Sequence, residues 1–282
     1  MSVLTRASRS LEQASLRELT GVVTHVQGLG LRVADLPLAV GALVRVESVG
    51  RTCCGEVVGF DAERTVVMLL GDAAGVRRGD RVVSGPVAGQ VPVGRALVGR
   101  VLDALGRPLD GKGPLRGAHR RPLAAEPLDP MQRVPIDQPL GTGVRAVDAM
   151  LPVGRGQRLG IFSGPGIGKS TLLGMIARQT EADVSVVALI GERGREVRDF
   201  IENALGPEGL KRSVVIAATA DEPALMRLRA ARYAACVAET FRDRGADVVL
   251  FMDSITRFCQ AQRQVGLAAG EPPATRGYPP SV

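Results

Sequence analysis

The stretch that decides the fold is Ser-Gly-Pro-Gly-Ile-Gly-Lys-Ser-Thr at residues 163–171. It follows an apolar run at 158–162 that we expect to form a strand, and it opens a segment at 169–180 that we expect to form a helix. Glycines in this context turn backbone N–H groups toward phosphate oxygens, and the helix N-terminus favours negative charge. Ser163 stands where the usual pattern has glycine. The stretch still predicts a site for a nucleotide phosphate chain.

The residues of this loop have separate expected roles. Lys169 is expected to reach the β and γ phosphates, and the Ser170 hydroxyl is expected to hold Mg²⁺. The predicted nucleotide-binding residues are Gly164, Pro165, Gly166, Ile167, Gly168, Lys169, Ser170 and Thr171. The alternative is a glycine-rich turn that carries a lysine by chance.

Two carboxylates follow other apolar strands. One strand ends at Asp253, and another at 184–190 leads into Gly-Glu-Arg-Gly-Arg-Glu at 191–196. Parallel strands end at a common edge, so Asp253 is expected to face the loop and hold Mg²⁺, usually through water. Glu192 could orient and deprotonate an attacking water, and Arg257 could contact the γ phosphate or Glu192. The alternatives are a helix N-cap for Asp253 and a charged surface turn for Glu192.

The N-terminal part has a different texture. Short β-rich runs cut by glycine predict a small β-barrel, with strands near 22–26, 42–49, 51–60, 65–70 and 80–83. A segment dense in Gly and Pro follows and is typical of a connector made of turns. We place an N-terminal arm at 1–20, the barrel at 21–93, the connector at 94–150 and the nucleotide-binding core at 151–282.

The core alternates strands and helices. Beyond the loop we expect helices at 169–180, 195–205, 222–244 and from 254, and strands at 184–190, 214–218 and 248–252. Near-continuous apolar strands are typical of a parallel sheet covered on both faces. The arginines of the helix at 222–244 are expected to form its solvated face. The fold class predicted is therefore α/β, a phosphate-loop core with a parallel sheet, preceded by a β-barrel.

Charge and composition restrict the function. The formal charge is +7, but residues 95–135 alone carry eight basic and four acidic side chains, so the surplus is concentrated in the connector. Residues 1–94 contain one aromatic residue, Phe60, which disfavours a single-strand nucleic-acid binder. No apolar run is long enough for a membrane span and the N-terminus lacks a signal-peptide core, so we expect a cytoplasmic protein. The four cysteines are expected to be free thiols.

Three motifs together carry a family resemblance. The sequences at 191–196 and 253–258 and the closing segment at 270–282 resemble those of the flagellar and type III secretion ATPases, which are similar to the catalytic subunits of F-type ATP synthases. The connector sequence at 99–111 and Ala-Gln-Arg at 261–263 fit the same family. The family tolerates a small residue other than glycine at the start of the phosphate loop.

The resemblance implies a core of RecA type and a homohexameric ring that hydrolyses ATP with Mg²⁺ to drive protein export. It assigns Lys169 and Ser170 to phosphate and Mg²⁺, Glu192 to the general base, Arg193 and Arg257 to active-site arginines, and Asp253 to the Mg²⁺ shell. The implied partners are the export gate, a regulator that binds the N-terminal arm, chaperones and export substrates. Peripheral association with the inner face of the cytoplasmic membrane is also implied, and nucleic acid is not an expected partner.

The family chain continues past Val282, so the resemblance also implies a truncated chain with weak or no activity of its own. Three readings stay open beside flagellar export. One is the injectisome branch of the same family, and another is an RNA-dependent translocase with the same core. The third is a noncatalytic ring member, which the presence of Glu192 disfavours.

Overall fold

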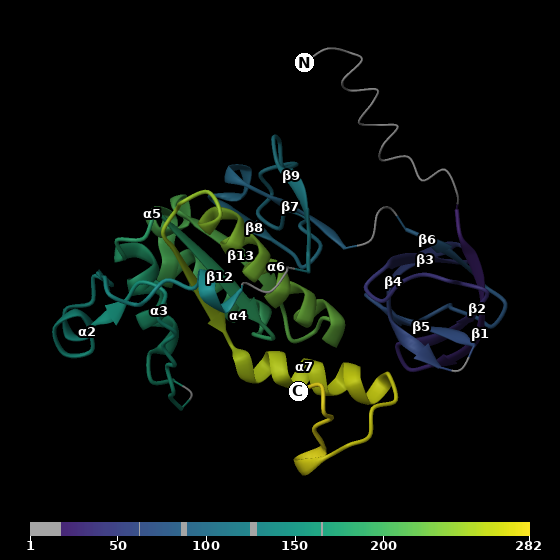
Figure 1. Cartoon of the computed structure of the whole chain (residues 1–282). Helices are drawn as coiled ribbons and strands as arrows, with labels where there is room; N and C mark the ends of the chain where they lie inside the picture. Colours follow the sequence, from purple (N-terminus) through teal and green to yellow (C-terminus); the bar gives the residue numbers. More distant parts are fainter. Residues whose placement is uncertain (1–17, 62, 86–88, 125–128, 165) are drawn as a thin grey trace. The chain divides into compact units, whose positions relative to one another are not determined.

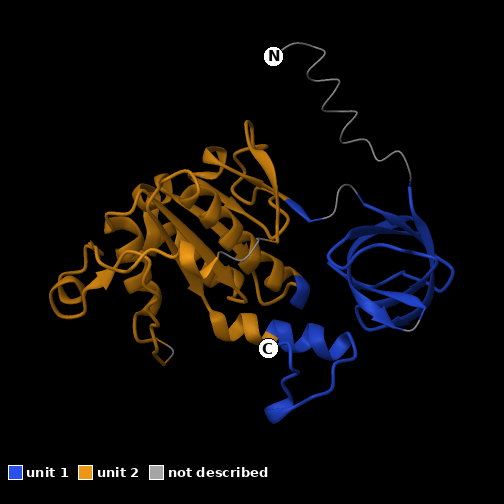
Figure 2. Ribbon diagram, in the orientation of Figure 1, with its two compact units in different colours: residues 1–90, 223–225, 261–282 blue, residues 91–222, 226–260 orange. Residues whose placement is uncertain are grey.

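The computed structural model describes residues 18–61, 63–85, 89–124, 129–164 and 166–282 (Figure 1). Figure 2 shows two compact units: residues 1–90, 223–225 and 261–282 form the first, and residues 91–222 and 226–260 form the second. Almost all of the arm predicted at 1–20 lies outside the described residues. No helix in the described ranges is both long enough and apolar enough to cross a bilayer.

A closed six-stranded antiparallel barrel makes up most of the first unit (Figure 1). Its strands are β1 (Thr20–Gln27), β2 (Gly30–Ala34), β3 (Leu43–Ser48), β4 (Arg51–Asp61), β5 (Arg64–Leu69) and β6 (Arg81–Ser84). They run in the order β1-β2-β5-β4-β3-β6, and β6 pairs back onto β1. Alternate side chains such as Val23, Leu31 and Val67 point inward and are fully buried. The predicted barrel is confirmed, with β2 as a strand that sequence reasoning missed.

The second unit is built on a four-stranded parallel sheet. Its strands are β8 (Arg100–Leu102), β12 (Val184–Ile190), β13 (Ser213–Ala218) and β14 (Val248–Asp253), in the order β14-β12-β13-β8. Every residue of β12 and β13 is buried, as continuous apolar strands require. Leu189 pairs with Asp253 and Ile190 pairs with Ala218, so three strands end level with one another. The predicted parallel sheet is confirmed.

Helices cover this sheet. One side carries α3 (Lys169–Gln179), α4 (Gly194–Asp199), its π-helical continuation η3 (Phe200–Leu205) and α5 (Gly206–Lys211). Leu173 of α3 and Phe200 of η3 join Val187, Val215 and Phe251 of the strands in one core. The other long helices are α6 (Ala224–Arg242) and α7 (Ile255–Ala268), and Figure 1 shows α6 across the sheet from α3.

The α6 helix is more deeply buried than its sequence suggests. Arg229 is only 3% exposed, and Tyr233 is fully buried with its hydroxyl donating to the Pro92 carbonyl at 2.7 Å. Arg232 and Arg242 are exposed. The predicted solvated arginine face is therefore limited to a few positions, because Pro92 and the connector residues Arg121 and Pro122 contact the helix.

Short elements complete the second unit. They are β7 (Gln90–Val93) paired with β9 (His119–Pro122), β10 (Pro139–Leu140) paired with β11 (Val153–Gly154), α2 (Arg145–Met150), and the 3-10 turns η1 (Arg95–Leu97) and η2 (Pro130–Gln132). A further turn, η4 (Thr275–Gly277), lies in the C-terminal segment of the first unit. The connector predicted at 94–150 thus supplies β8, which pairs with β13 at the edge of the sheet.

The strand predicted at 158–162 is wrong. This segment is not assigned to any sheet, and Leu159 and Phe162 are 53% and 96% exposed. An apolar run forms a strand only when it reaches a free sheet edge with which it can exchange backbone hydrogen bonds. Here β12 has β13 and β14 on its two sides, and residues 158–162 pair with neither edge strand.

Candidate nucleotide-binding site

A cavity of about 630 Å³ opens at the carboxyl edge of the parallel sheet. Its lining includes the phosphate-loop residues Ser163, Gly164, Gly166, Gly168, Lys169, Ser170 and Thr171. Across from the loop, the lining includes Gly191, Glu192, Arg193, Glu196, Asp253 and Arg257. The structure therefore brings together segments that lie far apart in the sequence, such as those of Lys169 and Asp253, which are 84 residues apart.

The loop needs glycine for its backbone conformation. Gly166 and Gly168 have φ angles of +76° and +88°, a region that side chains with a Cβ rarely adopt. A Cβ at either position would meet no atom within 4 Å, so conformation rather than crowding explains these glycines. Ile167 is 72% exposed and does not line the cavity, so its expected contribution reduces to its backbone. Pro165 lies outside the described residues.

Lys169 and Asp253 form an ion pair inside the cavity. The Lys169 Nζ lies 2.5 Å from Asp253 Oδ1, and the Asp253 side chain is only 5% exposed. Lys169 is the first residue of α3, and Asp253 is the last residue of β14. The Asp253 carboxylate thus interacts with the phosphate loop, whereas the alternative reading makes it the cap of the next helix.

Glu192 lies directly beyond β12 with a second carboxylate as its neighbour. Burial raises the pKa of Glu192, and its hydrogen bond with Glu196 and the charge of Asp253 raise it further, while Lys169 opposes them. The same hydrogen bond lowers the pKa of Glu196, which also accepts from Arg193 Nη1 at 3.1 Å. A raised pKa means that the ionised carboxylate binds a proton more strongly, which favours its action as a general base. Sequence reasoning gave Glu196 no role, although it lies four residues after Glu192.

Arg257 reaches the cavity by passing over a glycine. Gly191 has a φ of +71°, and a Cβ built on it would lie 2.9 Å from Arg257 Cβ and 3.1 Å from Arg257 Cγ. The aliphatic part of Arg257 thus packs on the bare Cα of Gly191. The guanidinium donates to Gln260 Oε1 at 3.3 Å, and the described residues show no ion pair between Arg257 and Glu192. The close approach at Gly191 escaped the sequence analysis because Arg257 is distant along the chain.

The donor set of the cavity fits a magnesium ion that arrives with a nucleotide. Ser170 and Asp253 offer hydroxyl and carboxylate oxygens, the ligands that Mg²⁺ prefers. Among the described residues, no group of three or more His, Cys, Asp or Glu side chains could hold a metal by itself. Mg²⁺ in nucleotide sites takes most of its remaining ligands from phosphates and water, so two protein oxygens are sufficient.

The sequence matches two models of one protein family, in chain order. Residues 19–84 match the beta-barrel domain of the ATP synthase alpha/beta family, and residues 143–282 match the nucleotide-binding domain of that family. These two ranges contain the β-barrel and the candidate site.

Individual relatives extend the match to nearly the whole chain. The flagellum-specific ATP synthase of Pseudomonas aeruginosa is 51% identical over 273 residues, covering 93% of this chain and 59% of the relative. The type 3 secretion system ATPase of Xanthomonas euvesicatoria is 48% identical over 282 residues, covering 99% of this chain and 63% of the relative. The chain thus spans about three fifths of the length of these relatives.

A solved structure shares the fold. It is the assembled ATPase EscN in complex with its central stalk EscO, from the type III secretion system of enteropathogenic E. coli. The TM-score is 0.85 at 41% identity, covering 93% of this chain and 64% of that one. With the barrel, the parallel sheet, the phosphate loop and matches to both family models, the chain is similar to flagellar and type III secretion ATPases and belongs to the ATP synthase alpha/beta family.

Proposed function

We propose that this chain is the barrel and nucleotide-binding part of a Mg-ATP hydrolase that acts as a homohexameric ring and energises protein export through the flagellar type III apparatus. The cavity that gathers Lys169, Glu192 and Asp253 at one edge of the sheet carries the proposal. The flagellar relatives favour the flagellar branch.

The residues of the cavity have separate roles in the proposed hydrolysis. The Gly166–Gly168 turn presents backbone N–H groups to the phosphates, and Lys169 exchanges Asp253 for the β and γ phosphates when nucleotide enters. Mg²⁺, when bound with the nucleotide at Ser170 and Asp253, supplies positive charge against the phosphate oxygens. Glu192 accepts the proton of the attacking water.

Two arginines balance charge around these groups. Arg193 holds Glu196 at 3.1 Å, so we infer that it keeps this carboxylate oriented beside Glu192. Arg257, which passes over Gly191 into the cavity, is placed to contact the γ phosphate. Both arginines are active-site groups in this proposal.

The proposed partners follow the relatives. The similar EscN structure is an assembled ATPase bound to a central stalk, which supports a ring and a stalk-like partner for this protein. Beyond that, we propose contacts with the export gate, with a regulator at the N-terminal arm and with chaperones and their substrates. The proposed location is the cytoplasm, at the inner face of the membrane.

The second candidate is the same reaction in a virulence injectisome. The Xanthomonas relative, at 48% identity over 282 residues, is the observation that supports it. Motility and effector export in a strain that depends on this protein separate the two branches. An RNA-dependent translocase would be revealed by RNA stimulation of ATP hydrolysis, which we do not expect.

The decisive experiment measures the steady-state rate of Mg-ATP hydrolysis as a function of protein concentration. It compares this chain with a longer form of the same protein that has the full length of its relatives. We expect the longer protein to turn over with specific activity that rises cooperatively, since the proposed ring shares its sites between copies. Lys169→Ala should abolish turnover and export, whereas the control Lys112→Ala, at an exposed lysine that donates to the Gly99 carbonyl, should not. Normal export with Lys169→Ala would refute the coupling of hydrolysis to export.

A further inference from the structure

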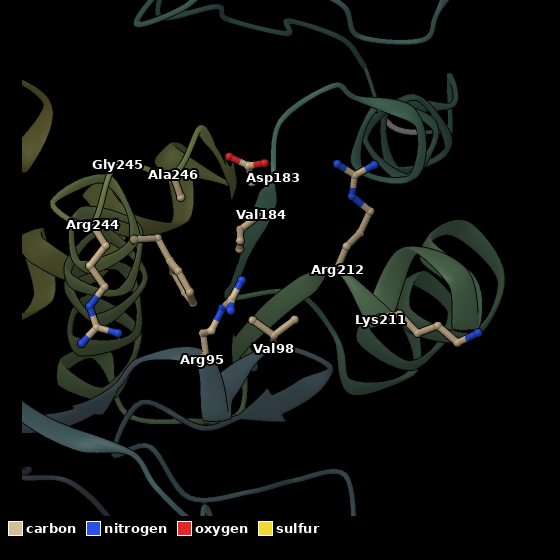
Figure 3. Close-up of a pocket in the computed structure, with 10 residues that line it drawn as sticks. Arg95, Val98, Asp183, Val184, Lys211, Arg212, Arg244, Gly245 and Ala246 are labelled. Atoms are coloured by element: carbon tan, nitrogen blue, oxygen red, sulfur yellow. The ribbon is translucent and has the colours of Figure 1, made fainter.

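A second cavity, of about 750 Å³, lies in the same unit at the opposite edge of the sheet (Figure 3). Its lining comes from residues that precede or begin the four parallel strands: Val98 before β8, Asp183 and Val184 at β12, Lys211 and Arg212 before β13, and Gly245 and Ala246 before β14. Arg95, Phe241 and Arg244 complete it. None of these residues lines the nucleotide cavity.

The cavity combines an apolar floor with a cationic rim. Val184 and Phe241 are buried and line it beside Val98 and Ala246, while four cations and a single carboxylate stand around them. The carboxylate, Asp183, accepts from the Asp247 backbone N–H at 2.9 Å. The net charge of the lining is therefore positive, which favours an anionic ligand with an apolar part.

Three of the four cations have partners within the fold. Lys211 lies in the last turn of α5 and pairs with Glu208 at 2.7 Å, and Arg212 donates to the Ala182 carbonyl. Arg244 contacts the His119 ring at 3.0 Å. Cations near helix C-termini also stabilise the helix dipole, so these three are partly explained without a ligand.

Arg95 is not explained in this way. It is exposed and lies on the short turn η1, where its backbone carbonyl accepts from the Val98 N–H at 3.1 Å. Its guanidinium, however, makes no hydrogen bond or ion pair with another residue in the part of the chain that the structure describes. Figure 3 shows its guanidinium projecting into the space in front of Val98 and Val184. Arg95 also belongs to the segment 95–135 in which the positive charge surplus is concentrated. Elsewhere in that segment, Arg100 is bound by Asp110 at 2.7 Å.

The directions of the cations decide what kind of anion fits. In Figure 3 the charged ends of Arg95, Lys211, Arg212 and Arg244 are spread around the cavity and point in different directions. A compact anion such as phosphate requires donors that converge on one point. Separated cations around an apolar floor instead suit an extended ligand with carboxylates on either side of an apolar side chain.

We propose that this cavity is a docking site for an acidic peptide segment of a partner protein, in which carboxylates flank an apolar residue. The apolar side chain occupies the floor formed by Val98, Val184, Phe241 and Ala246. One flanking carboxylate pairs with Arg95, and another reaches the rim formed by Lys211 and Arg212. The site does not depend on nucleotide.

The test begins with an unbiased selection of short random peptides on the whole chain, followed by fluorescence anisotropy of the recovered peptides. We expect acidic residues on both sides of an apolar one and binding that weakens as salt is raised. Arg95→Glu should weaken binding about tenfold or more, since it reverses one charge contact. The matched control Arg232→Glu makes the same charge change at an exposed position of α6 outside the cavity and should bind normally.

Several outcomes would overturn the proposal. These are recovered peptides no more acidic than the library, and equal losses in the two variants. Displacement by inorganic tripolyphosphate or by single-stranded RNA at concentrations below that of a competing acidic peptide would instead identify a site for a compact or a nucleic-acid polyanion. Thermal unfolding of both variants checks that the loss at Arg95 is not a loss of fold, and a Val98→Asp variant tests the apolar floor independently.

Discussion

Removing either partner of the Lys169–Asp253 ion pair should destabilise the protein by very different amounts. In Lys169→Met the Asp253 carboxylate, 5% exposed, is left without its cation. Breaking a buried pair in this way costs about 3–5 kcal/mol, and we take about 3 because the cavity admits water. In Asp253→Asn the remaining charge is Lys169, whose side chain is 31% exposed, so water replaces the lost partner and the cost is about 1 kcal/mol.

Calorimetry without nucleotide measures this difference, because it follows the unfolding transition of the nucleotide-binding unit. At about 2–4 °C per kcal/mol, Lys169→Met should lower Tm by roughly 6–12 °C and Asp253→Asn by roughly 2–4 °C. The double variant should resemble Asp253→Asn, since it removes both charges and leaves no buried carboxylate without a cation. Equal losses in the two single variants, or additive losses in the double variant, would refute the reasoning that a buried carboxylate depends on this lysine.

Three further changes test other parts of the structure. Gly191→Ala should reduce ATP turnover, because its Cβ would lie 2.9 Å from Arg257 Cβ and would displace that side chain. The control is Gly50→Ala, which has the same kind of strain at φ +75° but no atom within 4 Å of its Cβ. Similar turnover in the two variants would contradict a role for the contact. Because burial raises the pKa of Glu192, the folded state binds that proton more tightly than the unfolded chain, so stability should fall as pH rises past the ordinary glutamate value and on through the raised pKa. Glu192→Gln should make the free energy of unfolding less dependent on pH in this range, and an unchanged dependence on pH would contradict the assignment to Glu192. Tyr233→Phe should lower the free energy of unfolding in urea by about 1 kcal/mol, since it removes the 2.7 Å hydrogen bond that the Tyr233 hydroxyl donates to the partly buried Pro92 carbonyl.

Much of the site could be predicted because its geometry follows from strand ends. Parallel strands that are buried on both faces are recognisable as apolar runs, and the residue after each run must lie at a common edge. This is why Glu192 and Asp253, although distant along the chain, could be assigned to one site from the amino-acid sequence. The register bears this out, since Leu189 pairs with Asp253. The roles of these carboxylates remain proposals.

Other parts depended on contacts that no local pattern records. The run at 158–162 has the composition of a strand, but pairing depends on a free sheet edge and not on composition. The strand β8 was hidden because three residues of a Gly- and Pro-rich connector form it, and its partner β13 lies more than 100 residues further along the chain. The packing of Arg257 on Gly191 is a tertiary contact of the same kind.

The two cavities also differ in how far local sequence patterns reveal them, and this difference leads to a final test. The nucleotide cavity depends on contiguous motifs, whereas the cationic cavity is assembled from single residues such as Arg95 that precede several strands. The seven residues of β12 separate the two edges by about 20 Å, beyond the range over which exposed charges interact strongly at physiological salt. Arg95→Glu should therefore leave ATP hydrolysis unchanged while it weakens peptide binding, and Lys169→Ala should do the reverse. Loss of both activities in Arg95→Glu, with the fold intact, would show that the two edges are coupled through the sheet and would refute their independence.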